Sequence, residues 1–154
     1  MIIALYKAQD HLFNRAVAWW EKGPYSHTEL IFSNGMSGSS SFRDKGVRVK
    51  KVVYKPEKWD FIVLPHGWHE GLAKDWFVIH DGEGYDNMGI VGHVWPPTPD
   101  TKDKWVCSEA VLAALGYEES WRFGPNDIAP MLMATPIQGC DFDFAKYGVI
   151  HESS

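Results

Sequence analysis

The chain has 154 residues, of which 45% are hydrophobic and 23% are charged. These fractions are close to those of globular proteins, so they argue against a disordered chain, and the length predicts a single domain over residues 1–154. The formal net charge of −5 argues against nucleic-acid binding through a broad basic surface, because contacts to phosphates need clustered lysine and arginine.

Two cysteines, Cys107 and Cys140, are too few for a disulfide framework, although they could form one bridge. The N-terminal segment lacks the basic region and the long apolar region of a signal peptide. No stretch of the sequence approaches the ~18 consecutive apolar residues of a membrane span. We therefore expect a cytoplasmic protein.

The first quarter of the chain predicts a strand, a helix and a hairpin. Residues 2–6 are typical of a short buried strand, and residues 9–21 carry apolar side chains at helical spacing. Residues 26–33 and 36–42 have the character of two strands that flank the pair Asn34-Gly35. Asn-Gly is a strong hairpin signal, so we expect these two strands to pair.

The middle of the chain predicts two further strands and a helix. Residues 47–54 alternate between apolar and charged side chains, which predicts an edge strand. Residues 59–65 form a nearly continuous apolar run, which indicates a central strand. Residues 68–80 have helical spacing, with Leu72, Trp76 and Ile79 expected on the buried face.

The last third begins with a long loop over residues 81–103, rich in glycine, proline and aspartate, and loops of this length are often functional. Residues 105–116 predict a buried helix that ends at a glycine, and residues 125–132 predict a second short helix. From residue 134 we expect a last strand and then a frayed tail. The sequence as a whole predicts an α+β fold, with an antiparallel sheet and two or three helices.

Cys107 is the first candidate catalytic residue, because it lies at the predicted start of a helix. Unpaired amide N–H groups and the helix dipole favour a thiolate at that position. The same N–H groups could stabilise an oxyanion, and Ser108 adds a hydroxyl beside them. The alternative is a buried structural cysteine. Cys140 has no histidine or helix start beside it, and we interpret it as structural or incidental.

His27 is the candidate general base, because it opens a predicted strand where it could face a thiol. A third residue would orient its ring. Glu29 lies two residues later and therefore on the same face of the strand. Alternatively, Ser39 or Ser40 on the return strand of the hairpin could face His27 across the ladder.

The stretch PYSHTELIFSNGMSGSSSFRDKGVRV resembles the histidine strand of NlpC-type papain-like hydrolases. The later stretches GEGYDNMGIVG, KWVCSEAVLAALG and RFGPNDIAPML resemble the cysteine half of that family. The family usually places the cysteine helix before the histidine strand, whereas His27 here precedes Cys107. This order resembles the circularly permuted, YiiX/YebB-like branch, to which the lecithin–retinol acyltransferase group is more distantly related.

The resemblance covers roughly residues 2–132, with gaps between residues 50 and 80, and it implies a papain-like fold and a cysteine peptidase or amidase. By this resemblance Cys107 is the nucleophile and His27 is the base. The third polar position falls near Ser39, where relatives often have His, Asn, Gln or Glu, so Glu29 is the alternative. Tyr85 could supply a hydroxyl to the oxyanion. The implied substrate is an amide bond in a peptide or a peptidoglycan-type cross-link, the reaction needs no cofactor, and the compact length would suit a bacterial or phage-encoded enzyme.

Three other readings compete with this hypothesis. A metal site would use the acids and histidines of the middle region, but neither a His-Glu-x-x-His motif nor paired cysteines occur. The residues in question are His66, His69, Asp81, Glu83, Asp86 and His93. A binding module with an inactive site would contact a protein partner or a glycan through tryptophans. These tryptophans are Trp19, Trp59, Trp68 and Trp95. Acyl transfer on a lipid would use the same cysteine and histidine, but no basic amphipathic helix or anchor is present.

Overall fold

The fold is known from a computed structural model, which describes residues 1–7, 23–85 and 104–152. The helix predicted over residues 9–21 lies outside the described residues. Most of the loop predicted over residues 81–103 lies outside them as well.

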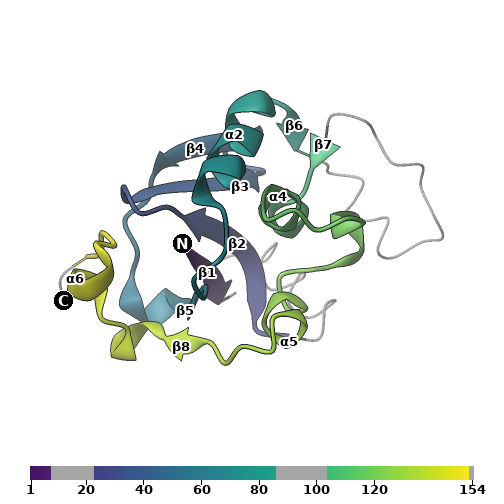
Figure 1. The fold of residues 1–154 in the computed structure, drawn as a ribbon. Helices are drawn as coiled ribbons and strands as arrows, with labels where there is room; N and C mark the ends of the chain where they lie inside the picture. Colours follow the sequence, from purple (N-terminus) through teal and green to yellow (C-terminus); the bar gives the residue numbers. More distant parts are fainter. Residues whose placement is uncertain (8–22, 86–103, 153–154) are drawn as a thin grey trace.

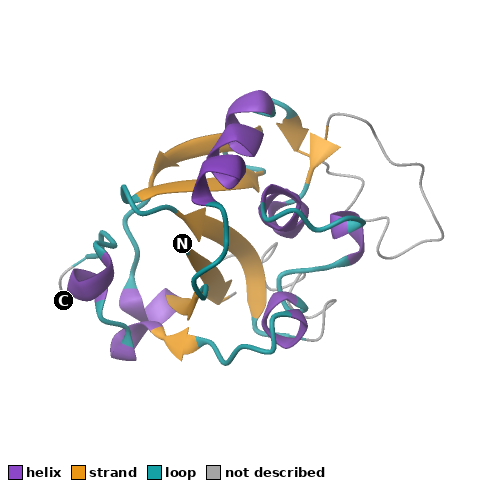
Figure 2. Ribbon diagram, in the orientation of Figure 1, coloured by secondary structure: helices purple, strands orange, loops and turns teal. Residues whose placement is uncertain are grey.

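The described strands form one curved sheet of eight strands in the order β7-β6-β4-β3-β2-β1-β5-β8 (Figures 1 and 2). The strands are β1 (Ile2–Lys7), β2 (Tyr25–Ile31), β3 (Met36–Ser41), β4 (Gly46–Lys51), β5 (Trp59–Val63), β6 (Gly84–Tyr85), β7 (Lys104–Trp105) and β8 (Ile137–Gln138). All pairs are antiparallel except β6 with β7, which are parallel. The sheet is therefore mixed, whereas the sequence predicted an antiparallel sheet.

The described part of the chain contains four α-helices and three short 3-10 helices. The α-helices are α2 (Glu70–Ile79), α4 (Cys107–Ala114), α5 (Ile128–Met131) and α6 (Phe144–Tyr147). The 3-10 helices are η1 (Pro56–Lys58), η2 (Ser120–Arg122) and η3 (Gly139–Asp141). The α+β class predicted from the sequence is confirmed, with more helices than expected. No described helix is long and apolar enough to cross a membrane.

Each face of the sheet is covered by its own apolar cluster. On one face the strands pack against α2, α4 and α5 through buried residues such as Leu30, Phe77 and Leu112. On the other face the C-terminal segment supplies Phe142 and Phe144, whose rings pack on Phe61 of β5. Figure 1 shows α4 and α5 to one side of β1 and β2, and α6 to the other. Alternate residues of each strand point to opposite clusters, as the period of two requires.

The predicted hairpin is present, and β2 and β3 flank the pair Asn34-Gly35. Gly35 adopts φ +76°, a left-handed conformation that glycine reaches at no steric cost, and its N–H donates to the carbonyl of Phe32. The turn sets the register of β2 and β3, in which Leu30 lies opposite Gly38 and Ile31 opposite Ser37. This register decides which side chains share a face at the other end of the hairpin.

The face of α2 was predicted wrongly. Leu72 and Ile79 are 66% and 74% exposed, whereas Ala73 and Phe77 are buried. The helix turns Phe77 toward the sheet because Gly38 of β3 leaves room there: a Cβ on Gly38 would lie 2.7 Å from the Phe77 ring. Trp76, also expected on the buried face, is half-buried and stacks on His80.

Two further expectations are corrected by the sheet. The strand at residues 47–54 is not an edge, because β6 pairs with β4 at Gly46 and the N–H of Val47 donates to the carbonyl of Glu83. The C-terminal tail does not fray after its strand. It continues into α6 and forms a bridge between Tyr54 and His151, since its aromatic side chains have a buried face to cover.

Candidate active site

Cys107 is the first residue of α4, as the sequence predicted, and it is buried and free of any disulfide. Val106 before it is extended, and its carbonyl accepts the first helical hydrogen bond, from the N–H of Ala110. The N–H groups of the first turn therefore have no helical acceptor ahead of them. Buried Val111 and Leu112 hold this helix against the sheet, which fixes the position of the thiol.

His27 lies on β2, and the structure brings its imidazole together with Cys107. Burial alone would lower the pKa of His27, because it disfavours the charged ring. The negative charge and hydrogen bond of Cys107, together with those of Glu29, outweigh burial and raise this pKa to about 9. The side chain of His27 is still 23% exposed, so part of it is open to solvent.

Glu29 is the residue that holds the imidazole. Its Oε1 lies 2.9 Å from Nε2 of His27, which leaves Nδ1 as the ring nitrogen for the thiol. The Glu29 side chain is only 3% exposed. Burial would raise the pKa of Glu29, but hydrogen bonds and charge from Arg48 and His27 lower it to about 2. Glu29 is therefore a carboxylate throughout the physiological range.

Arg48 of β4 is the partner of Glu29 that sequence reasoning missed. Its two terminal nitrogens donate to the two carboxylate oxygens, at 2.7 Å and 2.5 Å. Its Nε donates to Asp44 at 2.8 Å. The sequence pattern shows this arginine only as one of the charged residues that alternate along a predicted edge strand. The sequence held only a general indication of such a partner. A carboxylate that is buried next to an apolar run, as Glu29 is, needs a compensating cation.

Ser39, the alternative third residue, does not take the position beside His27 that we considered for it. Its hydroxyl donates to the carbonyl of Thr28 at 2.7 Å, with a longer contact to the carbonyl of Ser40. Ser40 in turn donates to the carbonyl of Trp105 at 2.7 Å, which ties β3 to the segment just before Cys107. A serine side chain is short and hydrogen-bonds readily to nearby backbone carbonyls. Ser39 therefore bonds to the backbone and not to the more distant imidazole of His27.

The two remaining predicted residues flank the site. Tyr85 lies on β6 opposite Trp105, and its ring packs edge-on against Phe42 with the centroids 5.9 Å apart. Ser108 is buried as the second residue of α4. Both therefore lie on elements that adjoin Cys107, and their role as hydrogen-bond donors stays a prediction.

Asn126 is a second residue whose contacts the sequence did not reveal. It lies just before the short helix α5, within the segment predicted as a short helix. Its side chain accepts from the N–H of Tyr25 at 2.9 Å and donates to the carbonyl of Tyr25 at 2.7 Å. At the start of β2, the amide of Asn126 thus makes the hydrogen bonds that the backbone of a neighbouring strand would otherwise supply. It fixes the end of the strand that carries His27.

The other end of the site is lined by aromatic residues of β1 and β5. Tyr6 pairs with His27 on one side and with Trp59 on the other. The Trp59 ring presents an edge to His27, with the centroids 6.2 Å apart. Nearby, Asp60 accepts from Tyr25 Oη and from Lys7 Nζ.

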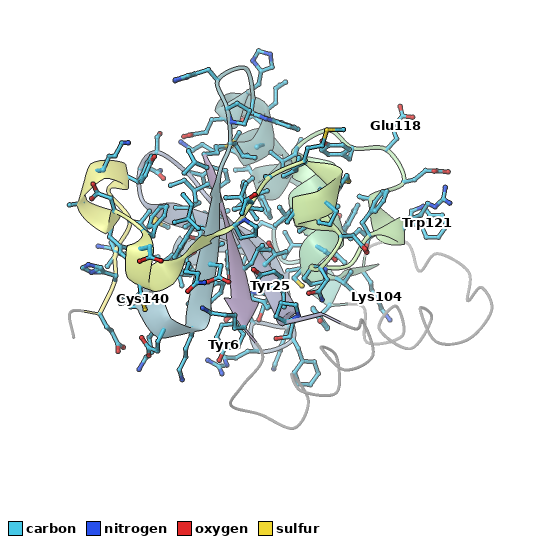
Figure 3. The ribbon with its side chains drawn as sticks, turned by 90° about the horizontal axis from the view of Figure 1, so that it is seen from below. Tyr6, Tyr25, Lys104, Glu118, Trp121 and Cys140 are labelled. Carbon is cyan, nitrogen blue, oxygen red and sulfur yellow. The ribbon has the colours of Figure 1, made fainter. Side chains whose placement is uncertain are left out.

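Figure 3 shows Tyr6 and Tyr25 together at this end of the sheet. Cys140 lies apart from them, beside the C-terminal segment, and it is exposed.

Within residues 1–7, 23–85 and 104–152, no cluster of three or more His, Cys, Asp or Glu side chains could hold a metal ion. Glu83, one of the metal candidates, instead accepts a hydrogen bond from Nε1 of Trp105 and lies 2.8 Å from Nδ1 of His80. Asp86 and His93 lie outside the described residues. So do Trp19 and Trp95 of the alternative binding surface.

In comparison with known proteins, no protein-family model matches the chain, and no curated protein matches it.

Proposed function

We propose that the protein is a papain-like cysteine hydrolase of the circularly permuted kind, which cleaves an amide bond in a peptide or a peptidoglycan-type cross-link. One observation carries the proposal. His27 is held between a cysteine at a helix start and a buried carboxylate, Glu29, so a nucleophile, a base and an orienting group follow one another. That order is the one cysteine hydrolysis needs.

The first half of the reaction forms an acyl-enzyme. The thiolate of Cys107 attacks the carbonyl carbon, a C–S bond forms, and the carbonyl electrons move to its oxygen. The N–H groups at the start of α4 stabilise this oxyanion. Protonated His27 then gives its proton to the departing amine nitrogen as the C–N bond breaks.

The second half returns the enzyme to its starting state. His27, now neutral, takes a proton from water, and the resulting hydroxide attacks the thioester carbon. The C–S bond breaks and releases a carboxylic acid and the thiolate of Cys107, again beside a protonated His27. Glu29 keeps the ring oriented through both steps and stabilises its positive charge.

Two measurements test the proposal. Iodoacetamide labelling read by mass spectrometry should modify Cys107 faster than Cys140 at pH 6, because only Cys107 has an imidazolium beside it. Incubation with defined peptides and with purified peptidoglycan should yield hydrolysis products that the Cys107→Ala variant does not form. Slow labelling of Cys107 that does not depend on His27, with no such products, would overturn the proposal and favour a binding module on this fold.

A further inference from the structure

We infer that Arg48 is a positioning residue of the proposed active site, because it completes a partly buried chain of alternating charges that runs from Cys107 through His27 and Glu29. This inference rests on the proposed function, since it concerns the reactivity of the same thiol. Arg48 touches neither the thiol nor the reacting carbonyl in the scheme above, so its effect passes through Glu29.

The geometry that supports this role is a two-point contact. Both terminal nitrogens of Arg48 donate to Glu29, one to each oxygen, and this arrangement fixes the plane of the carboxylate. The oxygen that faces Arg48 Nη2 is Oε1, the same atom that lies 2.9 Å from His27 Nε2. The orientation of Arg48 therefore decides where the hydrogen-bond acceptor of His27 lies.

The sheet register explains how an arginine two strands away reaches Glu29. Ser39 lies opposite Arg48 in the pairing of β3 with β4. The register of β2 with β3, continued by one residue beyond Leu30 and Gly38, places Glu29 opposite Ser39. Residues that face one another in neighbouring strands share a face. The serine is small, buried and turned back to the carbonyl of Thr28, so it leaves space above it for the arginine.

The charges of the four groups sum to zero. In the active form Cys107 is negative, His27 positive, Glu29 negative and Arg48 positive. Without the arginine this partly buried group would carry one net negative charge, which is costly where water is largely excluded. The system would relieve that cost by taking up a proton. A proton on Cys107 removes the thiolate, and a proton on Glu29 removes the carboxylate that stabilises and orients the imidazolium of His27. Arg48 therefore keeps the thiol reactive in acid.

Other charged and titratable groups around this chain do not replace Arg48. Asp44 is bound to Arg48 itself and to Lys50, farther from Glu29. Tyr54 feels the charge of Glu29, but burial is the main cause that raises its pKa, so it is a neutral phenol there. On the strands beyond His27, Lys7 is paired with Asp60.

The test is the pH dependence of Cys107 alkylation by iodoacetamide between pH 4 and 9, with Cys140 as the internal reference. We expect Arg48→Met to lower the labelling rate of Cys107 at pH 5–6 by about tenfold or more, which corresponds to a shift of the acid limb by about one pH unit, and to leave the rate at pH 9 nearly unchanged. Arg48→Lys keeps a charge but loses the two-point contact. Its labelling rate of Cys107 at pH 5–6 should therefore lie between those of wild type and Arg48→Met.

Controls separate positioning from folding and from the proposed function. Asp44→Asn removes the other carboxylate on Arg48 and should leave the profile as in wild type. The Glu29→Gln/Arg48→Met double variant should be no slower than Glu29→Gln, because the arginine then has no carboxylate to hold.

If wild type labels rapidly but Arg48→Met keeps its acid limb, the role of Arg48 is wrong and the hydrolase proposal stands. If wild-type Cys107 labels no faster than Cys140, both are wrong. If Arg48→Met does not fold, the pH dependence of Cys107 labelling in Arg48→Lys and in the double variant decides whether Arg48 has the proposed role.

Discussion

The two cysteines of this chain lie in opposite kinds of surroundings. Cys107 is buried at the start of an eight-residue helix and faces an imidazole, whereas Cys140 is exposed within the three-residue helix η3. Their side chains are chemically identical, so any difference in reactivity reports on the environment alone. Under the proposed function, the charges and N–H groups around Cys107, and not its residue type, would make it the nucleophile.

The largest expected effect is on turnover. Cys107→Ala should lower the hydrolysis of any peptide or peptidoglycan substrate by at least about a thousandfold, because the acyl-enzyme can no longer form. Cys140→Ala should leave hydrolysis unchanged. Product formation followed by mass spectrometry checks both variants, and an equal loss in the two would break the contrast between the cysteines.

The second effect is on the reactivity of Cys107 itself. His27→Ala should slow its labelling at pH 6 by about a hundredfold, to near the rate of Cys140, because the thiolate loses its cation. The labelling of Cys140 should not change. A His27→Ala protein that keeps rapid labelling of Cys107 at pH 6 would show that the helix start alone activates the thiol.

A third prediction concerns stability in acid. Glu29 has a pKa of about 2 in the folded protein, against 4.5 as the ordinary value. Its contribution to the free energy of unfolding is therefore fully present above pH 4.5 and is lost as pH falls toward 2. This loss should be on the order of 3 kcal/mol in urea titrations at pH 5 and pH 2.

Glu29→Gln should be less stable than wild type at pH 5, since Arg48 loses its partner, and its stability should depend less on pH below 4.5. Glu118 is exposed, so Glu118→Gln is the matched control and should follow wild type. A Glu29→Gln protein that follows the wild-type acid curve would contradict the assignment of the acid sensitivity to this carboxylate.

The smallest expected effect comes from the amide that holds the start of β2. Asn126→Ala should cost about 1–3 kcal/mol in the free energy of unfolding, because the N–H and carbonyl of Tyr25 lose their partners. The labelling rate of Cys107 relative to Cys140 should fall as well, since His27 is only two residues away. Unchanged urea midpoints together with unchanged labelling would show that water replaces this side chain without consequence.

The sequence predicted those features that depend on local patterns. The hairpin at Asn34-Gly35 and the helix that starts at Cys107 follow from turn chemistry and apolar spacing, and the structure contains both. The proximity of Glu29 to His27 follows from their spacing of two on a strand. These expectations need no knowledge of distant parts of the chain.

What the sequence did not predict depends on pairing between distant segments. The contact of Arg48 with Glu29 requires the register of three strands. The hydrogen bonds between Asn126 and Tyr25 join residues that are 101 positions apart in the sequence. The exposed face of α2 was unpredictable for a related reason, because Phe77 is buried only where Gly38 leaves room for its ring. Local propensity carries no information on either.

The C-terminal segment covers the sheet face on which Glu29 and Arg48 lie, and this has a consequence for synthesis on the ribosome. Strands β1 to β5 emerge well before Phe142, Phe144 and Val149, the residues that complete that cluster. The backbone of Tyr54 finds its partners, Ile150 and Glu152, later still. We therefore expect the nascent chain to expose an apolar surface until residues 142–152 have been made, so that the charged groups behind the thiol are enclosed only after this segment emerges.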